Sequence, residues 1–271
     1  MQHFQDMDTA ARKYFKSGNH TLSYLDFGGE SRHILLTLHG HMNDARTYSE
    51  LASKCTDWRV IGLDQRGHGW SEHPQDKDYS RESYLEDILN LIRIELGGQP
   101  VTLLGHSLGG VNAYQFAARY PELVHAVIVE DIGVEINADL SFAEALPTRS
   151  SSLQELRKSL EHAGIKAIDY FSESVFEDER GWGFRCDLKG MVISQQNLNG
   201  VWWDDWLASR CPILLIHGKK SFVLNADQAE RMVSRRPNTK LEIFEPCGHG
   251  VHSDDPYRFY QVVSEFLANV F

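Results

Sequence analysis

One serine stands between glycines in the segment Gly105-His106-Ser107-Leu108-Gly109, which follows an apolar run and precedes a helical pattern. In that context a G-x-S-x-G turn exposes the serine hydroxyl at a sheet edge, because the glycines permit a tight, strained turn. A serine hydroxyl is a poor nucleophile until a base accepts its proton. The segment predicts nucleophilic catalysis by Ser107, provided that a base and a carboxylate are supplied elsewhere. The alternative is a glycine-rich turn whose serine has no chemical role.

Two histidines near the end of the chain are candidates for the base. They lie in "EPCGHGVHSDDP", between an apolar run at 240–246 and a helical pattern at 255–270. His249 follows a glycine that lets the loop turn back over the sheet, so His249 is predicted as the base. His252, three residues later, is its competitor.

A carboxylate to orient the histidine is available in "VIVEDIGVE", which contains Glu130, Asp131 and Glu135. Asp131 follows Ser107 by 24 residues, the length of one strand–helix–strand unit, and is expected on the neighbouring strand. Side chains alternate along a strand, so Glu130 should point to the opposite side. Asp131 is therefore predicted as the orienting acid, against the alternative that these carboxylates merely cap the strand end.

Backbone amides are the expected stabilisers of the negatively charged oxygen. The segment "LTLHGHMND" turns at a glycine after an apolar strand, so the N–H of His41, or that of Met42, should combine with the N–H of Leu108. In the glycine-rich turn "LDQRGHGWS", Arg66 and His68 are predicted to be structural, because nothing pairs them with the serine.

The elements that must position these groups alternate along the chain, which predicts an α/β fold with a mostly parallel sheet covered by helices. Short apolar runs predict strands at residues 21–27, 33–38, 57–63, 100–105, 125–130, 212–218 and 240–246. Helical spacing predicts helices at residues 80–96, with Ser80 as N-cap and Gly97-Gly98 as the stop, and at 108–120, 225–236 and 255–270.

The alternation breaks between residues 134 and 208. This segment is predicted to be a helical cap over the strand ends, inserted into a core formed by 1–133 and 209–271. Its aromatic residues suggest a moderately apolar substrate pocket, with Trp182 and Trp203 as candidate lining residues. The alternative is that the tryptophans fill the small core of the segment itself.

Arg185, in "GWGFRCD", is a further candidate for substrate binding. Its guanidinium could bind a substrate carboxylate in a bidentate manner. The competing interpretation is a salt bridge with Asp187 or a similar acid.

Composition narrows the function classes. The chain has 271 residues and a formal charge of -11, which argues against nucleic acid as a partner. No apolar run is long enough to predict a membrane span, and the N-terminal residues contain no apolar core of a secretory signal. The cysteines form no CxxC pair and are expected to be thiols in a cytoplasmic protein. They are Cys55, Cys186, Cys211 and Cys247.

Together, "HGH", "DQRGHGWS", "GHSLGG" and "CGHGVH" resemble the α/β-hydrolase superfamily over essentially the whole chain. The resemblance implies an eight-stranded, mostly parallel sheet and the chain order Ser, acid, His. Its usual acid position, after the strand before the last, reads "HGKKSFVLN" and contains Ser221 but no acid. The acid in "VIVEDIG" resembles a minority branch that includes small acyl-ester and thioester esterases and an acetamidomethylene-succinate hydrolase.

These features predict acyl transfer to Ser107 from a small ester, thioester or related acyl compound, with no metal or organic cofactor. One alternative keeps the triad for C–C or C–N hydrolysis, or for cofactor-independent ring cleavage by oxygen. Ring-cleaving dioxygenases that share the acid placement usually have a Trp in the "DQRGHG" turn, where this chain has Gln65. Another alternative is a hydrolase-fold protein that binds a ligand without turning it over.

Overall fold

An eight-stranded sheet forms the centre of the computed structural model, which describes residues 10–29 and 31–270. β1, β2 and β4 pair antiparallel, and the remaining neighbours pair in parallel. This arrangement confirms the predicted α/β class and mostly parallel sheet. In their order across the sheet, the strands are β1 (Ala11–Ser17), β2 (His20–Asp26), β4 (Arg59–Asp64), β3 (Ile34–Leu38), β5 (Val101–His106), β6 (Val124–Glu130), β11 (Ile213–Gly218) and β12 (Thr239–Phe244).

β1 is the one strand of this sheet that the apolar runs do not predict. It lies at the sheet edge, and only Phe15 and Ser17 of its seven residues are buried. An edge strand with a mostly exposed, polar sequence leaves too weak a hydrophobic pattern to detect. The other seven strands coincide with the predicted runs to within two residues at each end.

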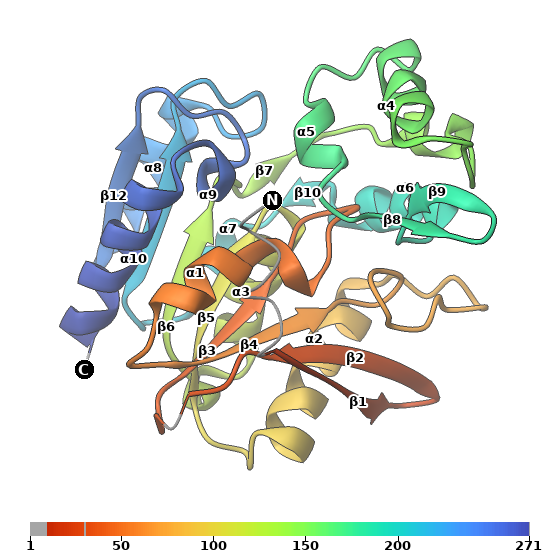
Figure 1. Cartoon of the computed structure of the whole chain (residues 1–271). Helices are drawn as coiled ribbons and strands as arrows, with labels where there is room; N and C mark the ends of the chain where they lie inside the picture. The colour runs from red at the N-terminus through yellow and green to blue at the C-terminus, as the bar shows by residue number, and fades with distance from the viewer. Residues whose placement is uncertain (1–9, 30, 271) are drawn as a thin grey trace.

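Side chains of the central strands alternate between two apolar cores on opposite faces of the sheet. In β6, Ala126 and Ile128 enter one core, and Val127 and Val129 enter the other. Glu130 continues the first series and therefore points to the first face. That face is covered by α1 (Ser49–Lys54) and α10 (Pro256–Val270), and the opposite face by α2 (Arg81–Asn90), α3 (Leu108–Arg119) and α8 (Ala226–Arg235) (Figure 1).

The start and stop signals of α2 act as the sequence predicts. The Ser80 side chain accepts a hydrogen bond from the Ser83 amide at the N-cap. The helix continues into a π-helical turn, Leu91–Glu95, and Gly97 and Gly98 then adopt positive φ. Short helices flank the loops, namely Ala45–Tyr48, Pro121–Leu123 and α9 (Val251–Asp254).

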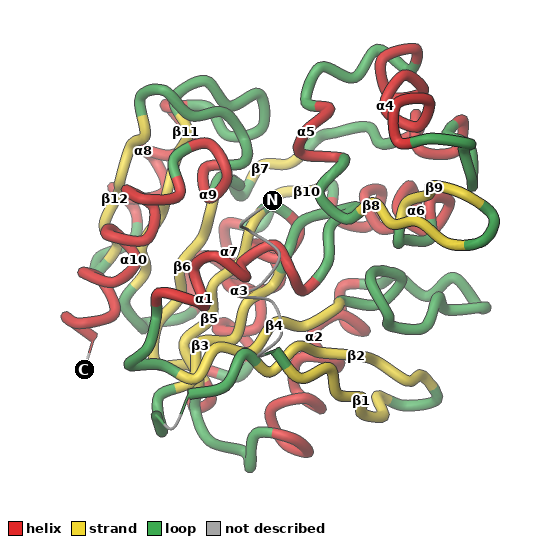
Figure 2. The backbone as a smooth tube through the Cα atoms, in the orientation of Figure 1, coloured by secondary structure: helices red, strands yellow, loops and turns green. Residues whose placement is uncertain are grey.

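A long segment separates β6 from β11 and lies at the end of the sheet toward which β6 points (Figure 1). It consists of short elements joined by loops (Figure 2). They are β7 (Glu135–Ile136), a 3-10 helix (Ser141–Ala145), α4 (Leu153–His162), α5 (Ile168–Phe171), β8 (Val175–Asp178), β9 (Gly181–Phe184), α6 (Leu188–Leu198), β10 (Gly200–Val201) and α7 (Trp203–Ala208).

The last helix of this segment, α7, lies against the core. The Trp206 ring meets Tyr114 of α3 edge-on, with centroids 5.7 Å apart, and both rings are buried. Residues 134–208 therefore end in a helix that packs against the helix layer of the sheet.

The four cysteines are free thiols, as the sequence predicts. Cys55, Cys186 and Cys247 are buried and Cys211 is half-buried. Within the described ranges, no helix combines the length and the apolar character that crossing a bilayer requires.

Candidate active site

Ser107 occupies a strained turn between β5 and α3. Its φ is 51° and its ψ is -116°, a combination that L-residues rarely adopt. Glycine is required on both sides, because a Cβ on Gly105 would overlap the carbonyl of Gly109, and a Cβ on Gly109 would overlap that of Leu38. The close approach of β3, β5 and α3 thus explains the G-x-S-x-G pattern.

Two more strained residues lie at the same edge of the sheet. Of the non-glycine residues that the structure describes, five have positive φ, and Met42, Ser107 and Asp131 are three of them. Each follows a parallel strand of the sheet, respectively β3, β5 and β6. Such strain clusters where a protein must hold a group in an otherwise unfavourable position.

Asp131 is fully buried and bonded to His249. The Nδ1 of His249 donates to Oδ2 of Asp131 over 2.8 Å. Oδ1 accepts from the amide of Gly218 at 2.9 Å and from Nδ1 of His217 at 3.3 Å. Burial alone would raise the pKa of Asp131, but the hydrogen bonds from His217 and His249 outweigh it and lower this pKa. Asp131 is therefore held as a carboxylate.

Ser221, at the position where the resemblance places an acid, also binds Asp131. Its hydroxyl donates to Oδ2 of Asp131. The same hydroxyl oxygen accepts from the amides of Val223 at 3.0 Å and Leu224 at 3.3 Å. The carboxylate of Asp131, which follows β6, thus lies beside the loop after β11, where the Ser221 hydroxyl donates to it.

His252 is held away from Ser107 on the other face of the sheet. Its Nδ1 lies 2.8 Å from Oε1 of Glu130, and its Nε2 lies 3.1 Å from Oε1 of Glu173. The Tyr48 hydroxyl donates to Oε2 of Glu130 at 2.7 Å. Burial alone would lower the pKa of His252, but the two carboxylates raise it well above 6.5. His252 is therefore a buried cation, and Glu130 points away from Asp131, as strand alternation predicts.

His106, the residue before Ser107, supports the loop of His249. Its Nε2 donates to the carbonyl oxygen of His249 over 2.9 Å, and the two rings lie 4.5 Å apart. Burial lowers the pKa of His106 to about 3, so the ring is neutral. The G-x-S-x-G pattern leaves this position open, so the sequence gives no signal for a role of His106.

The amides predicted to stabilise an oxyanion lie at two chain turns. Among the described residues, neither the N–H of His41 nor that of Leu108 has a hydrogen-bond acceptor. Leu108 begins α3, where helix amides are free and carry partial positive charge. The His41 side chain points to Ser194, with its Nε2 2.8 Å from the hydroxyl oxygen.

A cavity of about 380 Å³ brings Ser107, His249 and His41 together. Its polar lining also includes Asp139, Lys166 and Gln195. The rest of the lining is mostly apolar and comes from the sheet edge, from the loop after β11 and from the segment 134–208. These residues are Ile132, Ile136, Ala138, Leu140, Phe142, Gly164, Ile165, Ala167, Tyr170, Phe171, Leu198, Phe222 and Val223.

Arg185 is not among the described residues that line this cavity. Its guanidinium is sandwiched between the rings of Trp70, at 3.9 Å, and Phe176, at 4.0 Å. Asp187, the acid considered as its partner, instead accepts from Lys77 at 2.7 Å. The stacking between two aromatic rings holds Arg185 away from Ser107.

The two candidate tryptophans also lie outside the described cavity lining. Trp182 is in β9, where its backbone pairs with Ser150. Trp203 donates from Nε1 to Glu135 at 2.8 Å, and the guanidinium of Arg235 lies 4.3 Å from its ring. Phe142, Tyr170 and Phe171 supply the aromatic lining from this segment instead.

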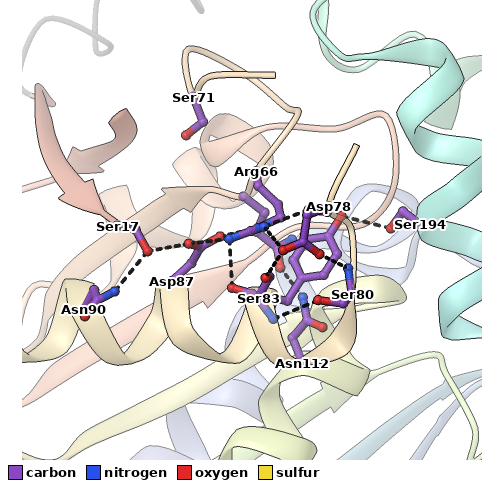
Figure 3. Close-up of polar contacts among 12 residues, drawn as sticks. Ser17, Arg66, Ser71, Asp78, Ser80, Ser83, Asp87, Asn90, Asn112 and Ser194 are labelled. Atoms are coloured by element: carbon purple, nitrogen blue, oxygen red, sulfur yellow. Dashed lines mark hydrogen bonds and ion pairs between the residues drawn. The ribbon is translucent and has the colours of Figure 1, made fainter. Parts of the chain in front are cut away.

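Arg66 is structural, as its sequence context predicts. Its Nε lies 2.7 Å from Oδ2 of Asp87, and Oδ1 of Asp87 accepts from the Ser17 hydroxyl over 2.6 Å (Figure 3). This buried ion pair joins the glycine-rich turn to α2 and β1. The nearby His68 ring is fully buried, and burial lowers its pKa well below 6.5.

Comparison with known proteins agrees with this architecture. The family model described as "alpha/beta hydrolase fold" matches residues 33–160. An uncharacterised protein of Mycobacterium tuberculosis is 30% identical over 259 residues, covering 86% of this chain and 74% of that protein. An esterase of Mycobacterium tuberculosis is 27% identical over 263 residues, covering 91% of this chain and 86% of the esterase.

A solved structure is also similar in fold. The crystal structure of E-2-(acetamidomethylene)succinate hydrolase superposes with a TM-score of 0.81 at 23% identity. The match covers 96% of this chain and 99% of that one.

Proposed function

The chain belongs to the α/β-hydrolase superfamily, and we propose that within it the protein is a serine hydrolase of small carboxylic esters or thioesters. One arrangement carries this proposal. Ser107 and His249 line the same cavity. The buried Asp131 carboxylate accepts a hydrogen bond from Nδ1 of His249, with 2.8 Å between Nδ1 and Oδ2. A nucleophile, a base and an orienting acid are the parts that acyl transfer needs.

The reaction proceeds in two steps. Ser107 attacks the carbonyl carbon while Nε2 of His249 accepts its proton, and the negative oxygen forms beside the amides of His41 and Leu108. His249 then returns the proton to the leaving alcohol or thiol. In the second step water, activated by His249, attacks the acyl group on Ser107 and releases the acid. Asp131 holds the imidazole with Nδ1 protonated throughout.

Residues 134–208 act as a cap that shapes the acyl pocket. This part of the proposal is supported by the contribution of the segment to the lining, which includes Ile136, Leu140, Phe142, Ile165, Phe171 and Leu198. The cavity of about 380 Å³ lies at the small end of the range for ligand pockets, about 300–1,000 Å³. A short or medium apolar acyl group fits this lining.

The polar lining favours an uncharged acyl group. Lys166 is the one lysine or arginine among the described lining residues, and its side chain is exposed. The solved relative is titled as a hydrolase of a succinate derivative, a dicarboxylate. A dicarboxylate requires cationic partners that the apolar wall of this cavity lacks among its described residues.

The test is hydrolysis of p-nitrophenyl esters from acetyl to octanoyl by the wild type and by Ser107→Ala. Release that depends on Ser107 and rises to an optimum within this series is the expected result. Activity that survives in Ser107→Ala contradicts the nucleophile. A folded wild type that releases no p-nitrophenol from any of these esters contradicts the esterase proposal.

A further inference from the structure

Tyr170 is the aromatic residue of the segment 134–208 that lies beside the reacting groups. It belongs to α5 and lines the cavity with Ser107 and His249. Its ring centroid is 5.3 Å from that of His249 and 5.4 Å from that of His106. No sequence motif includes this residue.

The hydroxyl of Tyr170 lies over the loop that carries the His41 amide. It donates to the His41 carbonyl oxygen over 3.5 Å, and its position would be overlapped by a Cβ on Gly40. A glycine at position 40 therefore makes room for this hydroxyl.

This hydroxyl remains a hydrogen-bond donor, and the hydrogen bond that it makes is weak. Burial raises the pKa of Tyr170 well above 10, so the phenol stays protonated at neutral pH. Its hydrogen bond to His41 is long at 3.5 Å, which is at the limit for a useful interaction. A stronger acceptor that forms nearby can therefore take this hydrogen bond.

We propose that the Tyr170 hydroxyl donates a third hydrogen bond to the substrate carbonyl oxygen as it becomes negative, beside the amides of His41 and Leu108. The inference rests on the proposed function. No proton is transferred, because the phenol only turns its O–H from the His41 carbonyl toward the new oxyanion. Tyr170 is thus a catalytic residue, and the cap supplies part of the catalytic machinery.

The experiment compares Tyr170→Phe with the wild type on p-nitrophenyl butyrate and ethyl butyrate. Loss of one oxyanion donor typically lowers kcat by about 10²–10³-fold, so a kcat loss near the lower figure is expected for both esters, with KM little changed. A trifluoromethyl ketone, to which Ser107 adds to form an oxyanion, should bind more weakly to Tyr170→Phe by a similar factor. Phe171→Leu, a pocket-wall variant in the same helix, should instead change KM and the preferred acyl length.

Three outcomes overturn the role of Tyr170. The first two are an unchanged kcat and a change confined to KM. The third is a loss of kcat that is much larger for the ethyl ester than for the p-nitrophenyl ester, because that result would place the hydroxyl at the leaving group. A wild type that hydrolyses neither ester defeats the proposed function separately. The fluoroketone affinities of the two folded proteins still decide the role of Tyr170 in that case.

Discussion

Two consecutive acidic residues at the end of β6 each hold a histidine from the region after β12, and the two pairs serve different ends. Asp131 binds Nδ1 of His249, and Glu130 binds Nδ1 of His252, each over 2.8 Å. Both acids are fully buried. The hydrogen bond between the acid and Nδ1 of the histidine is therefore the same in the two pairs. The pairs differ in what surrounds the other ring nitrogen.

The second nitrogen of each imidazole decides what the pair can do. His249 faces the cavity that contains Ser107, whereas Nε2 of His252 is bonded to Glu173 at 3.1 Å. A histidine with one nitrogen on a carboxylate and the other free can accept a proton. A histidine between two carboxylates is held as a cation and cannot act as a base. The Asp131 pair is thus suited to catalysis, and the Glu130 pair ties the segment 134–208 to the core.

The largest expected effect is the loss of activity in Asp131→Asn. An amide at this position favours the wrong tautomer of His249, so kcat should fall by about 10⁴-fold while the fold is retained. Steady-state ester hydrolysis measures this loss, and circular dichroism checks the fold. A near-normal kcat would move the orienting role to another residue and remove the distinction between the two pairs.

The complementary variant is His252→Gln, which should affect stability more than catalysis. Removing the cation leaves Glu130 buried without its counter-charge, and breaking such a pair typically costs about 3–5 kcal/mol. Urea denaturation should show this loss in the free energy of unfolding. The kcat per folded molecule should stay within about tenfold of the wild type, because His252 does not line the cavity. A stable variant with a kcat as low as that of Asp131→Asn would assign the base to His252.

The pH dependence of stability should distinguish the pairs further. The pKa of His252 is raised above 6.5 in the folded protein. The contribution of His252 to the free energy of unfolding is therefore complete below about pH 6.5 and is lost as pH rises through the folded-state pKa. Burial alone would raise the pKa of Glu130, but His252 lowers it from 4.5 to about 2. The contribution of the Glu130 carboxylate to the free energy of unfolding is therefore lost as pH falls through about 2.

The stability difference between the wild type and His252→Gln should therefore be widest between about pH 4.5 and pH 6.5 and should narrow at alkaline pH. Urea denaturation of both proteins across this range and at alkaline pH measures the difference. A difference that grows as pH rises above 6.5 would show that His252 is neutral in the folded protein.

The smallest expected effect is that of Ser221→Ala. This variant removes one of the hydrogen bonds to Asp131 and leaves those from Gly218 and His249. A hydrogen bond to a charged group contributes about 1.5–3 kcal/mol, so kcat should fall by about 10- to 100-fold, far less than in Asp131→Asn. Equal losses in the two variants would make Ser221, rather than the carboxylate, the group that orients His249.

The separation of the two acid–histidine pairs could be predicted from the sequence. Strand alternation along β6 is sufficient to separate Glu130 from Asp131, because side-chain direction depends only on local geometry. The turn around Ser107 is predictable as well, because the close approach of β3 and α3 requires glycines there and so leaves a pattern in the sequence. Asp131 lies one strand–helix–strand unit later and meets His249 because parallel strands end at a common edge.

The pocket residues could not be predicted in this way. Arg185 and Trp203 have suitable chemistry but are held by Trp70 and Arg235 in contacts that depend on the folded segment 134–208. Tyr170 reaches the site through the fold of a short helix, and no periodicity in the sequence points to it. Residues of an irregular insertion are positioned by tertiary packing, which spacing along the chain does not encode.

The most direct test of the proposed triad is the rate at which a fluorophosphonate labels the folded protein. The serine oxygen displaces fluoride from phosphorus, and peptide mass analysis identifies the modified residue. We predict a single adduct on Ser107 in the wild type, with labelling much slower in His249→Ala and in Asp131→Asn. A folded wild type that is not labelled on Ser107, or labelling equally fast in His249→Ala, would contradict it.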